Sequence, residues 1–136
     1  MARWSVKRIT SIPTVSDGDP DDPVWYPVQH ALGIETFGVN VLVASRAQQM
    51  LVEEHDEHRS GQQELYVVLE GEAAFELDGE RTDLDRGTAV AVTDPSVRRS
   101  ARAMVADTTL LIIGAGSGAF TSTWNPEHFS DIPQPD

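Results

Sequence analysis

The sequence predicts a single all-β domain, built as a sandwich or a barrel. Three observations support this: apolar segments of strand length recur at a spacing of roughly 8–12 residues, turn-forming residues separate them, and none has the period of a stable helix. The chain has 136 residues, enough for one domain with one hydrophobic core. Its composition, 40% hydrophobic and 7% aromatic, is that of a folded globular protein rather than a disordered one.

The N-terminal part of the chain is expected to contain one clear strand. Residues 1–29 form an N-terminal arm with a basic start and, at 16–23, an acidic loop rich in Gly and Pro. In residues 34–44, β-branched residues alternate with others, which favours a strand. Residues 44–50 have the composition of one helical turn, although the segment is too short to be a stable helix by itself.

The rest of the chain has the pattern of successive strands. Asp78-Gly79 is a strong signal for a tight hairpin turn between two of them. Near the C-terminus, Asn125 is a suitable N-cap and Pro126 a suitable first helical residue, so a short helix is expected within the tail, residues 121–136. The expected strands lie in residues 64–71, 73–80, 87–95, 96–106 and 108–116.

Residues 53–64 carry the side chains of a candidate metal or ligand site. Glu64 opens an apolar strand, where an acid costs several kcal/mol unless it is paired or coordinated. Because successive side chains of a strand point to opposite faces, Glu64 and Tyr66 share a face and would line a pocket. His55 and His58 lie a few residues upstream, close enough in sequence for their side chains to reach the opening of the same pocket. Two imidazoles with a carboxylate form a partial ligand set for iron, manganese, nickel or zinc. The opposite face is wholly apolar and is expected to be buried: Leu65, Val67 and Leu69.

These motifs resemble those of small single-domain cupins. Glu64, followed after six residues by Gly71, is similar to the second half of the first cupin motif, and a hairpin follows it as in the family. The strand opened by Gly87 resembles the second motif, and the resemblance covers roughly residues 30–114. It implies a cupin-type double-stranded β-helix, a jelly-roll barrel at 30–120, commonly dimeric and with its ligand site inside the barrel.

The first motif departs from the family pattern in its histidines. The family's paired histidines are separated by one residue, whereas two residues separate His55 from His58. Counting back from Glu64 by the usual spacing falls on Glu57 and Arg59 instead. Because the histidine of the second motif is also missing, the resemblance implies at most three of the four metal ligands of the family.

The second motif has an arginine in place of its histidine. The motif count favours Arg98 as the residue that faces the barrel interior, whereas the polarity pattern favours Arg99. A guanidinium does not ligate a metal and repels one nearby, but it binds a carboxylate or phosphate through two parallel hydrogen bonds. The same guanidinium could equally pair with Glu64 and close the pocket.

Three functions are compatible with these residues. The leading hypothesis is a barrel that binds a small organic, anionic ligand, with metal bound weakly or not at all. The alternative is a metal-dependent enzyme, an oxygenase, isomerase or cyclase, in which His55, His58 and Glu64 hold divalent iron, manganese, nickel or zinc; Tyr66 or His30 would then transfer the proton. The third is an inert barrel that acts as an interaction module. The candidate ligand-binding residues are His30, Glu64, Tyr66, Arg98 and Arg99.

The charge and composition argue against several other classes of function. The net charge is −12, from 22 acidic and 10 basic side chains, so nucleic acid and anionic membrane surfaces are not expected as partners. Cysteine is absent, which excludes disulfides and zinc–thiolate sites. The first residues have no apolar block of signal-peptide length, so a cytoplasmic protein is expected, with a small-molecule ligand and a homodimer as the expected partners.

Overall fold

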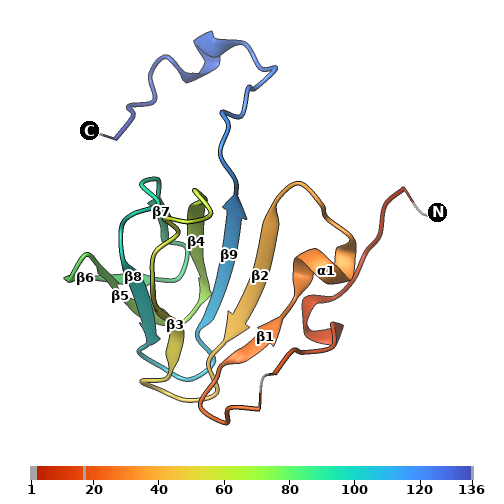
Figure 1. The fold of residues 1–136 in the computed structure, drawn as a ribbon, viewed down its shortest axis with the longest axis vertical. Helices are drawn as coiled ribbons and strands as arrows, with labels where there is room; N and C mark the ends of the chain where they lie inside the picture. The colour runs from red at the N-terminus through yellow and green to blue at the C-terminus, as the bar shows by residue number, and fades with distance from the viewer. Residues whose placement is uncertain (1–2, 17, 136) are drawn as a thin grey trace.

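A computed structural model describes residues 3–16 and 18–135 of the chain and shows two antiparallel sheets packed face to face (Figure 1). The first sheet has five strands in the order β1-β2-β9-β4-β7, and the second has four in the order β3-β8-β5-β6. The first two residues of the arm, Asp17 of the acidic loop and Asp136 of the tail lie outside the described residues. The predicted all-β class is therefore confirmed.

The strands alternate between the two sheets along much of the chain. The five-stranded sheet contains β1 (Val24–Tyr26), β2 (Gly38–Val43), β4 (Gln63–Glu70), β7 (Ala89–Val92) and β9 (Thr109–Ala115). The four-stranded sheet contains β3 (Met50–His55), β5 (Glu72–Leu77), β6 (Glu80–Asp85) and β8 (Arg99–Ala103). The helical elements are short: η1 (Ile9–Ser11), α1 (Val28–Leu32) and η2 (Pro126–Phe129).

The main core lies between the two sheets. Tyr66 and Val68 of β4 meet Phe75 of β5 there, and the rings of Tyr66 and Phe75 pack edge to face with centroids 5.4 Å apart. Ala101 and Leu110 complete this layer from β8 and β9. The inward face of β4 is therefore the face that begins with Glu64, as the alternation predicted.

The opposite face of β4 is less buried than expected. Leu65 and Val67 are half-buried, and Leu69 is 36% exposed, so the expectation of a fully buried second face was wrong. The physical reason is that this outer face is covered only in part. A second, smaller apolar cluster, centred on Val28 and Val39, covers its β2 side.

Two tight turns explain the positions of key glycines. Asp78 and Gly79 both have positive φ, 50° and 83°, as the predicted hairpin turn between β5 and β6 requires. Gly71, between β4 and β5, has φ 78°. A Cβ atom there would lie 2.8 Å from the Cα of Thr108 and would also contact its hydroxyl oxygen, so backbone conformation and space both require glycine.

One local expectation was wrong, some elements were not predicted, and the expected C-terminal helix is present. Residues 44–50 form no helical turn; the chain makes a tight turn with Gln48 at φ 67° and then enters β3, which the sequence did not predict. The helix α1 was also not predicted. The expected C-terminal helix is present as the 3-10 helix η2, and the side chain of its N-cap Asn125 accepts a hydrogen bond from the backbone N–H of Glu127.

The segment after β9 leaves the sheets, forms η2 and continues beyond it (Figure 1). Residues 115–135 are exposed throughout. Over the part of the chain that the structure describes, no helix is long and apolar enough to cross a membrane.

Candidate functional site

Glu64 lies at the start of β4 and points into the end of the barrel. Only 10% of its side chain is exposed. The hydroxyl of Tyr66, two residues further along the same face, donates a hydrogen bond of 2.8 Å to Glu64 Oε1. Gly114 of β9 lies opposite Glu64 in the ladder, and a Cβ atom there would lie 2.8 Å from Gln62 Oε1 and 3.7 Å from Glu64 Oε2. The glycine therefore leaves room for the end of the Gln62 side chain, and its contact with Glu64 would be an ordinary one.

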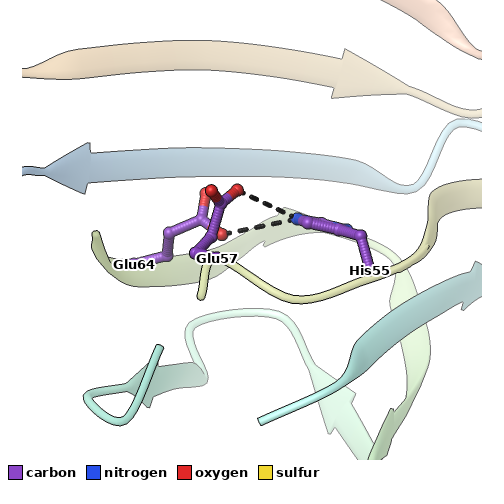
Figure 2. Close-up of side chains that lie close together, drawn as sticks. All are labelled: His55, Glu57 and Glu64. Atoms are coloured by element: carbon purple, nitrogen blue, oxygen red, sulfur yellow. Dashed lines mark ion pairs between the residues drawn. The ribbon is translucent and has the colours of Figure 1, made fainter. Parts of the chain in front are cut away.

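His55, the last residue of β3, points toward two carboxylates (Figure 2). Its Nε2 atom lies 3.2 Å from Glu57 Oε1 and 3.7 Å from Glu64 Oε1. Its Nδ1 atom lies 2.8 Å from the carbonyl oxygen of Glu53. Because a carbonyl can only accept, Nδ1 donates in this contact, and Nε2 is left as the atom that could ligate a metal.

The three side chains fit a divalent metal ion. One ligand atom from each of His55, Glu57 and Glu64 lies within 4.8 Å of the others. An imidazole and two carboxylates suit manganese, iron or zinc. Each has an outer partner as well: the Glu53 carbonyl for His55, the Tyr66 hydroxyl for Glu64, and the Ser60 hydroxyl, which donates to Glu57 Oε2 at 2.7 Å. Such outer hydrogen bonds fix the orientation of metal ligands.

His58 lies outside this group. Its side chain is exposed, and its backbone N–H donates to Asp56 Oδ1 in the turn after β3. Glu57 takes the place beside His55 and Glu64 that was expected for His58. Its backbone N–H donates to the carbonyl of Pro95 and so joins the turn after β3 to the loop between β7 and β8. The group that the structure brings together is thus His55, Glu57 and Glu64.

Arg99 is the arginine that faces the interior. It lies opposite His55 in the β3–β8 ladder and is 0% exposed. Arg98 points outward and forms ion pairs with Glu54 and Asp56, at 3.4 and 3.6 Å. The polarity pattern of the sequence therefore identified the inward arginine correctly, and the motif count did not.

The guanidinium of Arg99 is buried without a partner. Among residues 3–16 and 18–135, neither its Nε nor its two Nη atoms have a hydrogen-bond partner, and no carboxylate lies within ion-pair distance. It does not pair with Glu64, which was the structural alternative for this residue. A buried charge in this state costs several kcal/mol unless another group compensates it.

Tyr66 is a hydrogen-bond donor at neutral pH. Burial raises the pKa of Tyr66 above its ordinary range, and the charge and hydrogen bond of Glu64 raise it further. The charge of Arg99 lowers this pKa, and that of Glu57 raises it, so both groups lie near the phenol oxygen. The hydroxyl is therefore protonated and positions Glu64; a general-base role would require the phenolate.

His30 is not close to this cluster. It is exposed on α1, which packs against β2, so the residue is neither a packed core histidine nor a neighbour of His55.

Two site residues were not selected from the sequence. Counting back from Glu64 by the family spacing gives Glu57, and this spacing was its signal in the sequence. The neighbouring histidines were chosen as metal ligands instead. Gly114 ends an apolar strand-like segment rich in glycine. Its role follows only from its place opposite Glu64, which depends on the β4–β9 register.

Comparisons with known proteins give the fold. No model of a protein family and no curated protein matches the sequence. A cupin protein from Bacteroides fragilis has a TM-score of 0.67 and 17% identity, over 99% of this chain and 100% of its own. A sugar phosphate isomerase of the cupin superfamily from Silicibacter pomeroyi has a TM-score of 0.68 and 18% identity, over 83% and 76%. An RmlC-like cupin from Shewanella frigidimarina has a TM-score of 0.65 and 15% identity, over 86% and 93%.

The chain therefore has the cupin fold, the double-stranded β-helix that its motifs implied. The likeness extends over the two packed sheets that carry Glu64 and Arg99 at one end of the barrel.

Proposed function

We propose that the protein binds a small organic anion inside the barrel, with Arg99 as the receptor for a carboxylate or phosphate group. The observation that carries this proposal is the fully buried guanidinium whose three nitrogen atoms have no partner among the described residues. A planar guanidinium forms two parallel hydrogen bonds to a carboxylate or phosphate. The negative charge of such a group would compensate the buried positive charge.

A phosphate group as one form of this ligand is compatible with one of the similar structures. One of them is described as a sugar phosphate isomerase, so a cupin barrel is compatible with a phosphorylated small molecule. The identity of 18% carries only the fold, and the assignment of an anion to this chain rests on Arg99.

Access to Arg99 requires side chains at the barrel end to move. The guanidinium is closed off from solvent, whereas the side chains of His55 and Glu57 are 38% and 22% exposed. These two lie between solvent and the interior, and Glu57 belongs to the turn after β3. Rotation of these side chains is therefore the expected route for a ligand.

A thermal-shift screen with inorganic phosphate and small carboxylates tests the proposal. Wild-type protein and the Arg98→Gln variant should be stabilised by the same compounds, because Arg98 is paired at the surface. Arg99→Gln should fold and lose the response. If no oxyanion stabilises the wild-type protein with or without added metal, the proposal is wrong.

The second candidate function is a metal-dependent enzyme, an oxygenase, isomerase or cyclase. The group of His55, Glu57 and Glu64 favours it, with Glu57 in place of His58 as a ligand. A metal held there would polarise an oxygen atom of a bound substrate. Tyr66 would keep Glu64 in its ligating orientation through its 2.8 Å hydrogen bond.

Metal analysis of protein purified without a histidine tag tests this second function. Near-stoichiometric manganese, iron, nickel or zinc, lost in Glu57→Gln and kept in His58→Ala, would support it. Metal lost in His58→Ala but kept in Glu57→Gln would contradict the ligand set. An inert barrel that serves as an interaction module is the alternative favoured if neither anion nor metal binds.

A further inference from the structure

With His55 neutral, the charges at the barrel end do not balance in the absence of ligands. Glu57 and Glu64 contribute two negative charges on one side, and Arg99 contributes one positive charge deeper in the barrel. His55 lies next to both carboxylates and opposite Arg99 in the ladder. One end of the barrel therefore contains an excess of carboxylate beside a cation that has no partner.

An anion at Arg99 would meet this carboxylate charge. The phenol oxygen of Tyr66 lies 2.8 Å from Glu64 and is also within the electrostatic reach of Glu57 and Arg99. Repulsion from the two carboxylates opposes the attraction by one guanidinium, and the low dielectric of the interior strengthens both effects. In the metal-free protein an oxyanion should therefore bind weakly.

A divalent cation changes this balance. Bound between His55, Glu57 and Glu64, it would cancel the two negative charges and leave the single positive charge of Arg99. The reverse also holds, because the uncompensated guanidinium repels a cation in the same barrel end and an anion on Arg99 would remove that repulsion. Each occupant would thus make the site more favourable for the other.

We infer that the two occupants bind cooperatively: a divalent metal at His55, Glu57 and Glu64 strengthens the binding of an oxyanion at Arg99, and the oxyanion strengthens the binding of the metal to the same degree. The inference rests on the proposed anion binding at Arg99, and it adds a regulation of that site.

Titration calorimetry of chelator-treated, untagged protein tests the coupling, with Mn²⁺ and inorganic phosphate as probes. Mn²⁺ is titrated into the protein without and with phosphate, and phosphate is titrated without and with Mn²⁺. Blank titrations measure the heat from association of the two ions in buffer, and this heat is subtracted. The Mn²⁺ affinity should rise about tenfold with phosphate, and the phosphate affinity should rise by the same factor with Mn²⁺, because coupling between two sites is reciprocal.

Two neighbouring arginines provide matched variants. In Arg99→Gln, Mn²⁺ should bind more tightly than in the wild type when phosphate is absent, because the repelling charge is gone, and phosphate should no longer change that affinity. Arg98→Gln, which alters a surface ion-pair network, should keep the coupling of the wild type. Coupling that persists in Arg99→Gln would overturn the role of Arg99.

The remaining outcomes separate the inference from the proposed function. If the wild-type protein binds both ions with affinities that do not depend on each other, or binds phosphate but no Mn²⁺, the coupling is wrong and anion binding stands. If neither phosphate nor any of the small carboxylates binds to metal-free or to Mn²⁺-loaded protein, the proposed anion site itself is wrong.

Discussion

Arg99 lies directly opposite His55 across the β3–β8 ladder, so a buried cation and a potential metal ligand occupy the same end of the barrel. In the second cupin motif, the resemblance places a histidine where this chain has arginine. The substitution removes a ligand and puts a positive charge in its place. The carboxylates of Glu57 and Glu64 complement that charge without pairing with it, and this arrangement leads to the predictions below.

Replacing Arg99 by an apolar residue of similar length should stabilise the protein. The guanidinium is buried and has no partner among the described residues, so Arg99→Met removes an uncompensated charge and keeps the core filled. The free energy of unfolding in denaturant should rise by about 1–4 kcal/mol. Arg98→Met, at the surface, should change it by less than about 1 kcal/mol. A large loss of stability in Arg99→Met would show that a protein group compensates the charge.

Gly71→Ala should destabilise the fold far more than Gly87→Ala. The two glycines have similar positive φ, 78° and 83°, so both variants pay the same backbone strain of roughly 1–2 kcal/mol. Only at Gly71 does a Cβ atom approach a backbone atom, the Cα of Thr108, at 2.8 Å. The free energy of unfolding should therefore fall by at least about 2 kcal/mol more in Gly71→Ala. Similar losses in both variants would mean that Thr108 can move aside.

Tyr66 should keep its proton in alkaline solution for as long as the protein stays folded. Burial and Glu64 raise its pKa, so the folded chain holds the proton where the unfolded chain has lost it. Its contribution to stability is complete below the unfolded pKa of about 10 and is lost as the pH rises above that value. In a Tyr26→Phe variant, which leaves one tyrosine, tyrosinate absorbance above pH ~10 should develop only with unfolding. Absorbance that develops while the circular dichroism spectrum stays native would disprove this.

A homodimer is also predicted, and the outer face of β4 is its candidate interface. Leu65 and Val67 are half-buried there, and Leu69 is 36% exposed. Light scattering should give twice the mass of the chain for the wild type and the monomer mass for Leu69→Glu. Val105→Glu, at an exposed position in the loop between β8 and β9, is the control and should remain dimeric. A monomeric wild-type protein would remove this prediction.

The strand pattern of the sequence predicted most of the fold, but β1, β3 and β6 were not among the expected strands. Strand β4 has regular alternation and an unbroken ladder over most of its length, so its inward face was predicted correctly. Strand β3 lies at the edge of its sheet, and its ladder with β8 shifts register twice between Met50 and His55. Such bulges break the two-residue period. With two exposed acids as well, the segment resembles a loop in sequence.

The candidate site was predictable in the strand and less so in the turn. Glu64 and Tyr66 follow from alternation alone. The choice of Glu57 over His58 depends on the path of the turn after β3, which hydrogen bonds to Pro95 and Ser60 determine and no periodic pattern encodes. The choice of Arg99 over Arg98 depends likewise on where β8 begins.

The most direct test of anion binding at Arg99 is a crystal structure of the wild-type protein grown with Mn²⁺ and inorganic phosphate. The account predicts a phosphate with two of its oxygens within about 3 Å of the Arg99 guanidinium nitrogens, and Mn²⁺ bound by His55, Glu57 and Glu64. A guanidinium paired with a carboxylate of the protein, with no oxyanion beside it, would contradict the account.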